Sequence, residues 1–184
     1  MKDAVNLAEY VRDENFCSKY RVDPDAIFLL GHSMGGHTIM QAARALPWLR
    51  GTLAITPYDP AYYLKMGQEE LLRELLQQGK ILHSEGVEAI FQDILAHRQD
   101  YGFENAFEAL KEQNIFCAAG SKDACAPADI MFRPLWDRLQ AYENRAVQRF
   151  VEYPAGHGLF GFRTALIRDM AQFLRDVLEK PEQI

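Results

Sequence analysis

The stretch GHSMGG, residues 31–36, decides how this 184-residue chain folds. It follows the apolar run 27–30 (IFLL), whose length and lack of polar residues are typical of a strand buried on both faces of a parallel sheet. A helical pattern begins directly after it and ends at Pro47. The sequence therefore puts Ser33 at a glycine-rich turn from a buried strand into a helix.

Three further β-rich runs follow, and each is ended by turn residues. They are 52–56 (TLAIT), 115–119 (IFCAA) and 147–153 (VQRFVEY). Helical patterns occupy 3–16 and 163–179. Strands that alternate with helices predict an α/β fold, with a mostly parallel sheet flanked by helices, in a single domain over residues 1–184.

A long helical segment separates the second and third strands, at about 61–114. Apolar stripes at helical spacing cover 71–76, 87–95 and 103–110. A crossover between parallel strands needs only one helix, so this segment is larger than the connection requires. We interpret it as a lid-like insert. Tyr58, Tyr62 and Tyr63 either line a substrate pocket there or pack the insert onto the core.

Ser33 lies in a Gly-x-Ser-x-Gly pattern between a strand and a helix, the context that makes this motif informative. A serine hydroxyl becomes a good nucleophile only when a base takes its proton, so it has to project from a sharp turn. The backbone N–H of Met34, at the helix N-terminus, is a natural donor to an oxyanion. The structural alternative is a glycine-rich turn with an incidental serine.

A base and an orienting acid should follow at the ends of later strands. His157, between Gly156 and Gly158, is the candidate base, and its alternative is an ordinary loop histidine. Asp123 is the candidate acid, and its alternative is a turn or helix-capping aspartate. Asp59, in the equivalent place after the second strand, is the rival acid.

The chain order Ser33, Asp123, His157 resembles the α/β-hydrolase family, through GHSMGG, GSKDACAP at 120–127 and PAGHG at 154–158. The stretch VDP at 22–24 is similar to the esterase and dienelactone-hydrolase or prolyl-oligopeptidase-like branches. The resemblance implies a serine hydrolase that cleaves a small-molecule carboxylic ester, thioester, or amide of peptide-like character. Ser33 would form the acyl-enzyme, His157 would be the base and Asp123 its orienter. An acyltransferase is the related alternative.

The resemblance covers the C-terminal two-thirds of the family's fold. It implies further strands before 27–30 and a second oxyanion donor on a His-Gly-Gly-like loop, and neither is found ahead of Ser33. We therefore expect a weak or inactive catalyst, because losing one oxyanion donor costs about 10²–10³ in rate. We also expect an exposed edge at strand 27–30 that promotes self-association. The alternative function is a non-catalytic or partner-completed fragment that acts as a binding or interaction module.

Composition limits the remaining classes. The net charge of −6 disfavours nucleic acid as the main partner, and no apolar run is long enough for a membrane span. Cys17, Cys117 and Cys125 have no metal-binding or disulfide spacing, which favours a reducing cytoplasm. No metal or cofactor is expected. His37, one helical turn after Ser33, is predicted to pack or to line the pocket.

Overall fold

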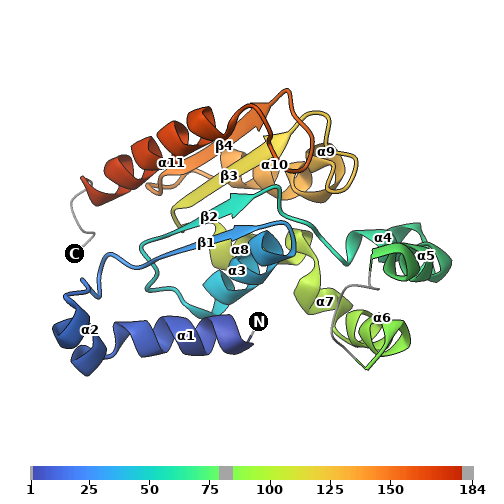
Figure 1. The fold of residues 1–184 in the computed structure, drawn as a ribbon, viewed down its shortest axis with the longest axis horizontal. Helices are drawn as coiled ribbons and strands as arrows, with labels where there is room; N and C mark the ends of the chain where they lie inside the picture. Colours follow the sequence, from blue (N-terminus) through green and yellow to red (C-terminus); the bar gives the residue numbers. More distant parts are fainter. Residues whose placement is uncertain (1, 79–84, 180–184) are drawn as a thin grey trace.

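The computed structural model describes residues 2–78 and 85–179. Four strands form one wholly parallel sheet in the order β1-β2-β3-β4 (Figure 1). They are β1 (Phe28–His32), β2 (Gly51–Ile55), β3 (Ile115–Gly120) and β4 (Gln148–Tyr153). The predicted α/β class with a parallel sheet and flanking helices is confirmed, and all four predicted strands are present.

Strand β1 is longer at its carboxyl end than the sequence suggested. Gly31 and His32 were assigned to the turn, but they pair in register with Ala54 and Ile55 of β2. The glycine adopts strand geometry there because the sheet partner fixes it. As a result, the turn is confined to Ser33, and His32 is the last residue of the sheet edge.

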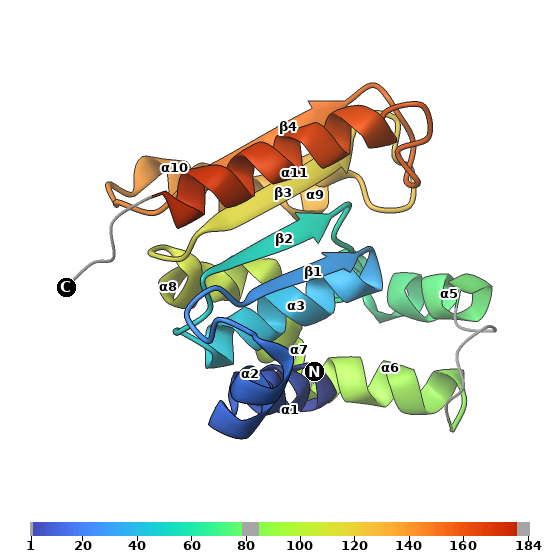
Figure 2. The same cartoon turned by 60° about the vertical axis from the view of Figure 1, so that its left-hand side comes forward.

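Helices cover both faces of the sheet. The helices that follow β1 in the described residues are α3 (Met34–Ala45), α4 (Tyr62–Met66), α5 (Gln68–Gln78), α6 (Val87–Ala96), α7 (Arg98–Tyr101), a 3₁₀ helix (Phe103–Ala106), α8 (Phe107–Leu110), α9 (Ala128–Met131), α10 (Arg133–Ala141) and α11 (Arg163–Leu178). α3, α8 and α10 share a core with one face, and α11 packs against the other. Figure 2 shows α11 running along β3 and β4.

The N-terminal region forms two helices, α1 (Lys2–Arg12) and α2 (Glu14–Tyr20), where a single helix over 3–16 was predicted. Asp13 causes the difference. Its carboxylate accepts hydrogen bonds from the backbone N–H groups of Asn15 and Phe16, at 3.0 and 3.2 Å. An aspartate that caps in this way starts a new helix, so the prediction of one continuous helix was wrong.

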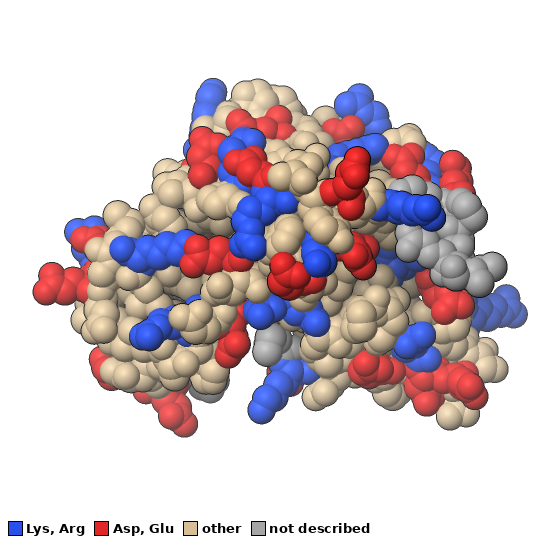
Figure 3. Space-filling view, turned by 180° about the vertical axis from the view of Figure 1, so that it is seen from behind, with Lys and Arg blue, Asp and Glu red and all other residues tan. Residues whose placement is uncertain are grey.

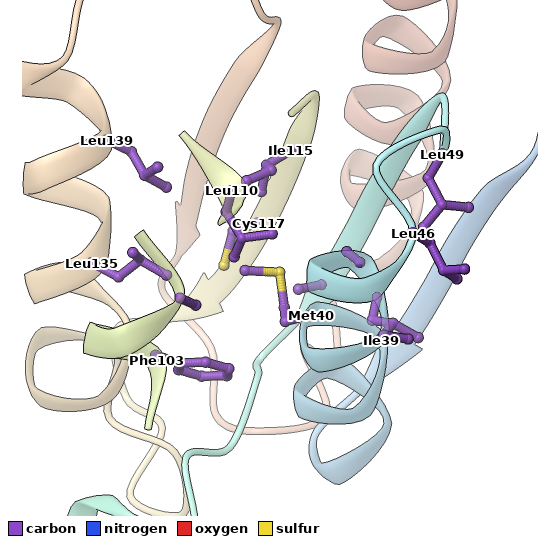
Figure 4. Close-up of a cluster of buried hydrophobic side chains, with 14 of the residues drawn as sticks. Ile39, Met40, Leu46, Leu49, Phe103, Leu110, Ile115, Cys117, Leu135 and Leu139 are labelled. Atoms are coloured by element: carbon purple, nitrogen blue, oxygen red, sulfur yellow. The ribbon is translucent and has the colours of Figure 1, made fainter. Parts of the chain in front are cut away.

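The larger core lies between the sheet and α3, α8 and α10. Figure 4 shows side chains from these elements converging, with Met40 of α3 next to Cys117 of β3. Phe103 and Leu110 belong to the same buried cluster. The second core lies beneath α11, where Phe116 of β3 meets Phe173 at a ring-centroid distance of 5.7 Å. Together the two cores fix the sheet and hence the places where its strands end.

The segment between β2 and β3 is helical, as predicted for the insert at 61–114, although the structure leaves 79–84 undescribed. Figures 1 and 2 show α4, α5 and α6 beyond the carboxyl ends of the strands. These helices have a small apolar cluster of their own, formed by Leu71, Leu75, Phe91 and Ile94. The insert therefore lies at the end of the sheet where the predicted site residues are found.

In the described part of the chain, β1 has a strand neighbour on one side only, as the expected edge requires. Leu30, in the middle of β1, is 57% exposed.

Figure 3 shows basic and acidic side chains intermingled over the face seen from behind. No helix among the described residues is long and apolar enough to cross a membrane.

Candidate active site

Ser33 occupies a strained turn between β1 and α3. Its φ of 57° and ψ of −121° lie in a region that non-glycine residues rarely adopt. Its N–H donates to Ile55 O at 2.9 Å, which ties the turn to β2. A Cβ at Gly31 would lie 2.2 Å from Gly35 O, so only glycine lets strand and helix approach this closely. The local sequence therefore builds a sharp corner with a serine at its tip.

The helix after Ser33 presents unpaired donors to the space beside it. The first intrahelical bond runs from His37 N–H to Ser33 O, at 3.0 Å. By helix geometry, the N–H groups of Met34, Gly35 and Gly36 have no acceptor inside the helix. The positive end of the 12-residue helix therefore adjoins the Ser33 hydroxyl, where it would favour a developing negative charge.

Asp123 and His157, from the loops after β3 and β4, are directly paired. His157 Nδ1 lies 2.8 Å from Asp123 Oδ2. Asp123 Oδ1 accepts the backbone N–H groups of Cys125 and Ala126, each at 2.9 Å. The Asp123 side chain is fully buried, whereas the imidazole is 26% exposed. Because a carboxylate only accepts, the neutral ring carries its proton on Nδ1, and its Nε2 lone pair is free to act as a base.

A close approach of two backbones brings these loops together. A Cβ at Gly120 would lie 2.3 Å from Ala155 O, so the end of β3 admits the β4 loop only because it is glycine. Ser121 N–H donates to Tyr153 O at 2.8 Å, and Lys122 N–H donates to Ala155 O at 3.0 Å. Backbone hydrogen bonds thus join the two loops, in addition to the side-chain contact between Asp123 and His157.

The His157 loop also lies against the Ser33 turn. His32 Nε2 is 3.1 Å from His157 O, and the two imidazole rings are 4.9 Å apart between centroids. Thr56, just after β2, donates its hydroxyl to the same carbonyl at 3.3 Å. The Ser33 side chain makes no hydrogen bond among the described residues. All four strand ends therefore converge on one location.

Solved structures of several esterases are similar to this chain. The acetyl xylan esterase 1 of Thermoanaerobacterium sp. matches with a TM-score of 0.60 and 17% identity, over 93% of this chain and 51% of that chain. The Pyrococcus furiosus esterase Pf2001 matches with a TM-score of 0.64 and 14% identity, over 95% of this chain and 60% of that chain. A truncated carbohydrate esterase from gut microbiota matches with a TM-score of 0.66 and 19% identity, over 97% of this chain and 68% of that chain. This chain has the α/β-hydrolase fold.

At these identities the similarity establishes the α/β-hydrolase fold alone. The chain spans 51% of the length of the acetyl xylan esterase and 60% of that of the Pyrococcus enzyme. No protein-family model and no curated protein matches the sequence. The chemistry of this α/β-hydrolase fold has to be argued from its own residues.

Asp59, the rival acid, serves a different purpose. Its Oδ1 accepts Ala61 N–H at 2.9 Å, and its Oδ2 accepts Phe103 N–H at 3.1 Å. The residue is buried, and this burial raises its pKa to about 6. Ala61 lies at the start of the insert and Phe103 begins its 3₁₀ helix, so Asp59 joins these two parts of the insert. Asp123 is the carboxylate that contacts His157.

The other candidate residues pack around the site. Tyr58 is buried and forms an apolar cluster with Ala126 and Met131, against which Tyr62 and Tyr63 pack. These tyrosines join the insert to the Asp123 loop, so packing, one of the two predicted roles, is observed.

His37 is buried, its Nε2 lies 2.8 Å from Tyr101 O, and its ring is 5.4 Å from that of Phe103. Desolvation lowers the pKa of His37 to about 4, so it is neutral and structural. It anchors the insert to α3. No group of three or more potential metal ligands occurs within residues 2–78 and 85–179.

The two glycines beside Ser33 allow a matched test of this geometry. Gly31→Ala is expected to destabilise the protein by about 1–3 kcal/mol or more, because its Cβ would overlap the Gly35 carbonyl. Gly35→Ala meets nothing within 4 Å and lies in a helix, so it should be neutral or stabilising by about 0.5–1 kcal/mol. Urea unfolding of both variants measures the difference. Equal effects would contradict the described turn.

Proposed function

We propose that this protein is a serine hydrolase that cleaves a carboxylic ester, thioester or amide through an acyl-enzyme on Ser33. The observation that carries the proposal is the Asp123–His157 pair, held by its loop against the strained turn that presents Ser33. A buried carboxylate on Nδ1, an accessible imidazole and a serine at a helix N-terminus are together the requirements of nucleophilic acyl transfer.

The steps follow from these positions. His157 Nε2 takes the proton of the Ser33 hydroxyl as the serine oxygen bonds to the substrate carbonyl carbon. The carbonyl oxygen becomes an oxyanion that the Met34 N–H stabilises. Asp123 stabilises the imidazolium, which returns its proton to the leaving alcohol, thiol or amine. A water molecule then attacks the acyl-enzyme, His157 takes its proton, and the released Ser33 oxygen regains a proton as the acid departs.

Carboxylic esters are the first substrates to try, because the similar structures include esterases that act on acetyl xylan and on carbohydrates. In this proposal the Met34 N–H is the oxyanion donor. Hydrolysis of a p-nitrophenyl ester by the wild type and by Ser33→Ala, at high protein concentration, tests the proposal. An equal rate for the two proteins would overturn it.

The exposure of Leu30 favours a second candidate function. In this candidate the protein is an interaction module that pairs with a partner through the exposed edge of β1. Leu30 lies on the same face as Leu53 and Ile55, which pack under α11. Exposed edge strands normally carry a charge or a proline that prevents pairing, and β1 carries neither. We expect the partner to be the β1 edge of a second copy, which would extend the sheet across a two-fold axis.

This pairing predicts a substitution-sensitive dimer. The wild type should sediment as a dimer, and Leu30→Lys should sediment as a monomer, because the lysine puts a charge into the apolar contact. Leu76→Lys is the matched control, since Leu76 is 51% exposed on α5 of the insert. Sedimentation velocity over a range of concentrations distinguishes the species. A wild type that is monomeric at every concentration would exclude this candidate.

A further inference from the structure

The backbone carbonyl of His157 is held by two side chains outside the proposed catalytic set. His32 Nε2 lies 3.1 Å from it, and Thr56 Oγ1 lies 3.3 Å from it. A carbonyl oxygen only accepts, so His32 carries its proton on Nε2 and the Thr56 hydroxyl donates. Donors from the ends of β1 and β2 therefore meet on one peptide group of the loop after β4.

Thr56 reaches this carbonyl from an unusual backbone conformation. Its φ is 42°, a region that β-branched residues strongly avoid. Its N–H donates to Ala118 O at 2.7 Å, and the residue is 1% exposed. Such strain persists only where surrounding contacts enforce it, and it is concentrated at functional sites. Thr56 is thus a strained residue in direct contact with His157, and Ser33, another strained residue, directly follows His32, which also contacts His157.

The loop that carries His157 is held by backbone hydrogen bonds on either side of that residue. Lys122 N–H donates to Ala155 O, and Leu159 N–H donates to Gly156 O, each at 3.0 Å. Glycines occupy both neighbouring positions, Gly156 and Gly158, and glycine leaves the backbone free to adopt many conformations. Asp123 holds Nδ1 and so limits rotation of the ring, but a contact on the ring does not fix the peptide that carries it. The two donors on His157 O act on that peptide directly.

We propose that His32 and Thr56 are positioning residues that fix the His157 peptide, and with it the direction of Nε2 toward Ser33. This inference rests on the proposed serine hydrolase function. Proton transfer requires Nε2 within hydrogen-bond reach of the hydroxyl, and a displacement of about 1 Å can cost about 10²-fold in rate. Neither residue touches the substrate in this role, so both should act on kcat and leave KM unchanged.

Paired variants test the role of each donor. Thr56→Val and His32→Leu remove the donors and are each expected to lower kcat about tenfold or more with little change in KM. Thr56→Ser and His32→Gln keep a donor and should recover most of the rate. Thr164→Val and His97→Leu are matched controls on α11 and in the insert.

Hydrogen–deuterium exchange gives a readout that does not depend on turnover. Peptides covering 154–160 should exchange faster in Thr56→Val and His32→Leu than in the wild type, while the melting temperature changes little. Because both donors act on one carbonyl, the double variant should lose less than the product of the two single losses.

The outcomes separate this inference from the function on which it rests. Unchanged kcat and unchanged exchange in both donor-removing variants would overturn the positioning role. Equal losses in Thr56→Val and Thr56→Ser would also overturn it, because the hydroxyl would then be irrelevant. A wild type without ester turnover and without a covalent adduct at Ser33 would overturn the hydrolase function, and the exchange data would still decide whether the two donors hold the loop.

Discussion

Ser33→Ala is expected to lower kcat/KM for a p-nitrophenyl ester by about 10⁴-fold or more. The proposed acyl-enzyme needs an oxygen at this position, and alanine has none. Folding should be unaffected, since the half-buried Ser33 side chain makes no hydrogen bond among the described residues. The effect should therefore appear in turnover and be absent from the unfolding curve.

The control for this substitution is Ser18→Ala, which removes an exposed serine from α2. It should leave turnover unchanged. If Ser33→Ala retained most of the wild-type rate, the observed hydrolysis would come from another nucleophile and the assignment of Ser33 would fail.

Asp123→Asn is the second large effect, with an expected loss of about 10⁴-fold in kcat. An asparagine has the same size and retains an oxygen for the Cys125 and Ala126 N–H groups. It cannot stabilise an imidazolium, and its amide favours the wrong tautomer of His157. Asp59→Asn should cost far less, because the Asp59 carboxylate accepts hydrogen bonds from two backbone N–H groups of the insert, those of Ala61 and Phe103. Steady-state kinetics of both variants decides between the two carboxylates.

Asp59 also has a distinct signature in the pH dependence of stability. Burial raises the pKa of Asp59 from its ordinary value of 3.8 to about 6, so the folded state binds the proton more tightly than the unfolded state. Stability from this group is therefore highest below about pH 4 and is lost as the pH rises to about 6. Asp59→Asn should remove that decline from melting curves recorded across this window.

The kinetic comparison of the two carboxylates has its own contradicting outcome. A loss of kcat greater for Asp59→Asn than for Asp123→Asn would mean that Asp59, and not Asp123, is the acid that orients His157.

The sequence was sufficient for the parts of the molecule that depend on local pattern. Apolar runs of strand length alternate along the chain with apolar stripes at helical spacing, and this alternation of strands with helices predicted the parallel sheet. Ser33 was identified because the strand, the glycines and the helix are contiguous. Asp123 and His157 followed because parallel strands end at one edge of a sheet, so that residues distant in sequence meet there.

The rest depended on register and on tertiary contacts that carry no local signal. The contact of His32 with His157 O arises only once β1 and β4 lie in one sheet, so no local pattern announces it. Thr56 adopts its conformation because β3 and the His157 loop hold it. The choice between Asp59 and Asp123 likewise depended on which loop approaches His157, and Gly120 determines this through backbone packing.

The most direct test of the central claim is to find where a fluorophosphonate forms its covalent adduct. The wild-type protein, incubated with the probe, should gain the mass of one phosphonyl group, and peptide mapping should place it on Ser33, because an activated serine attacks phosphorus as it attacks a carbonyl. Labelling should slow in His157→Ala and be absent in Ser33→Ala. An adduct on another residue, or none on a correctly folded wild type, would contradict the proposed function.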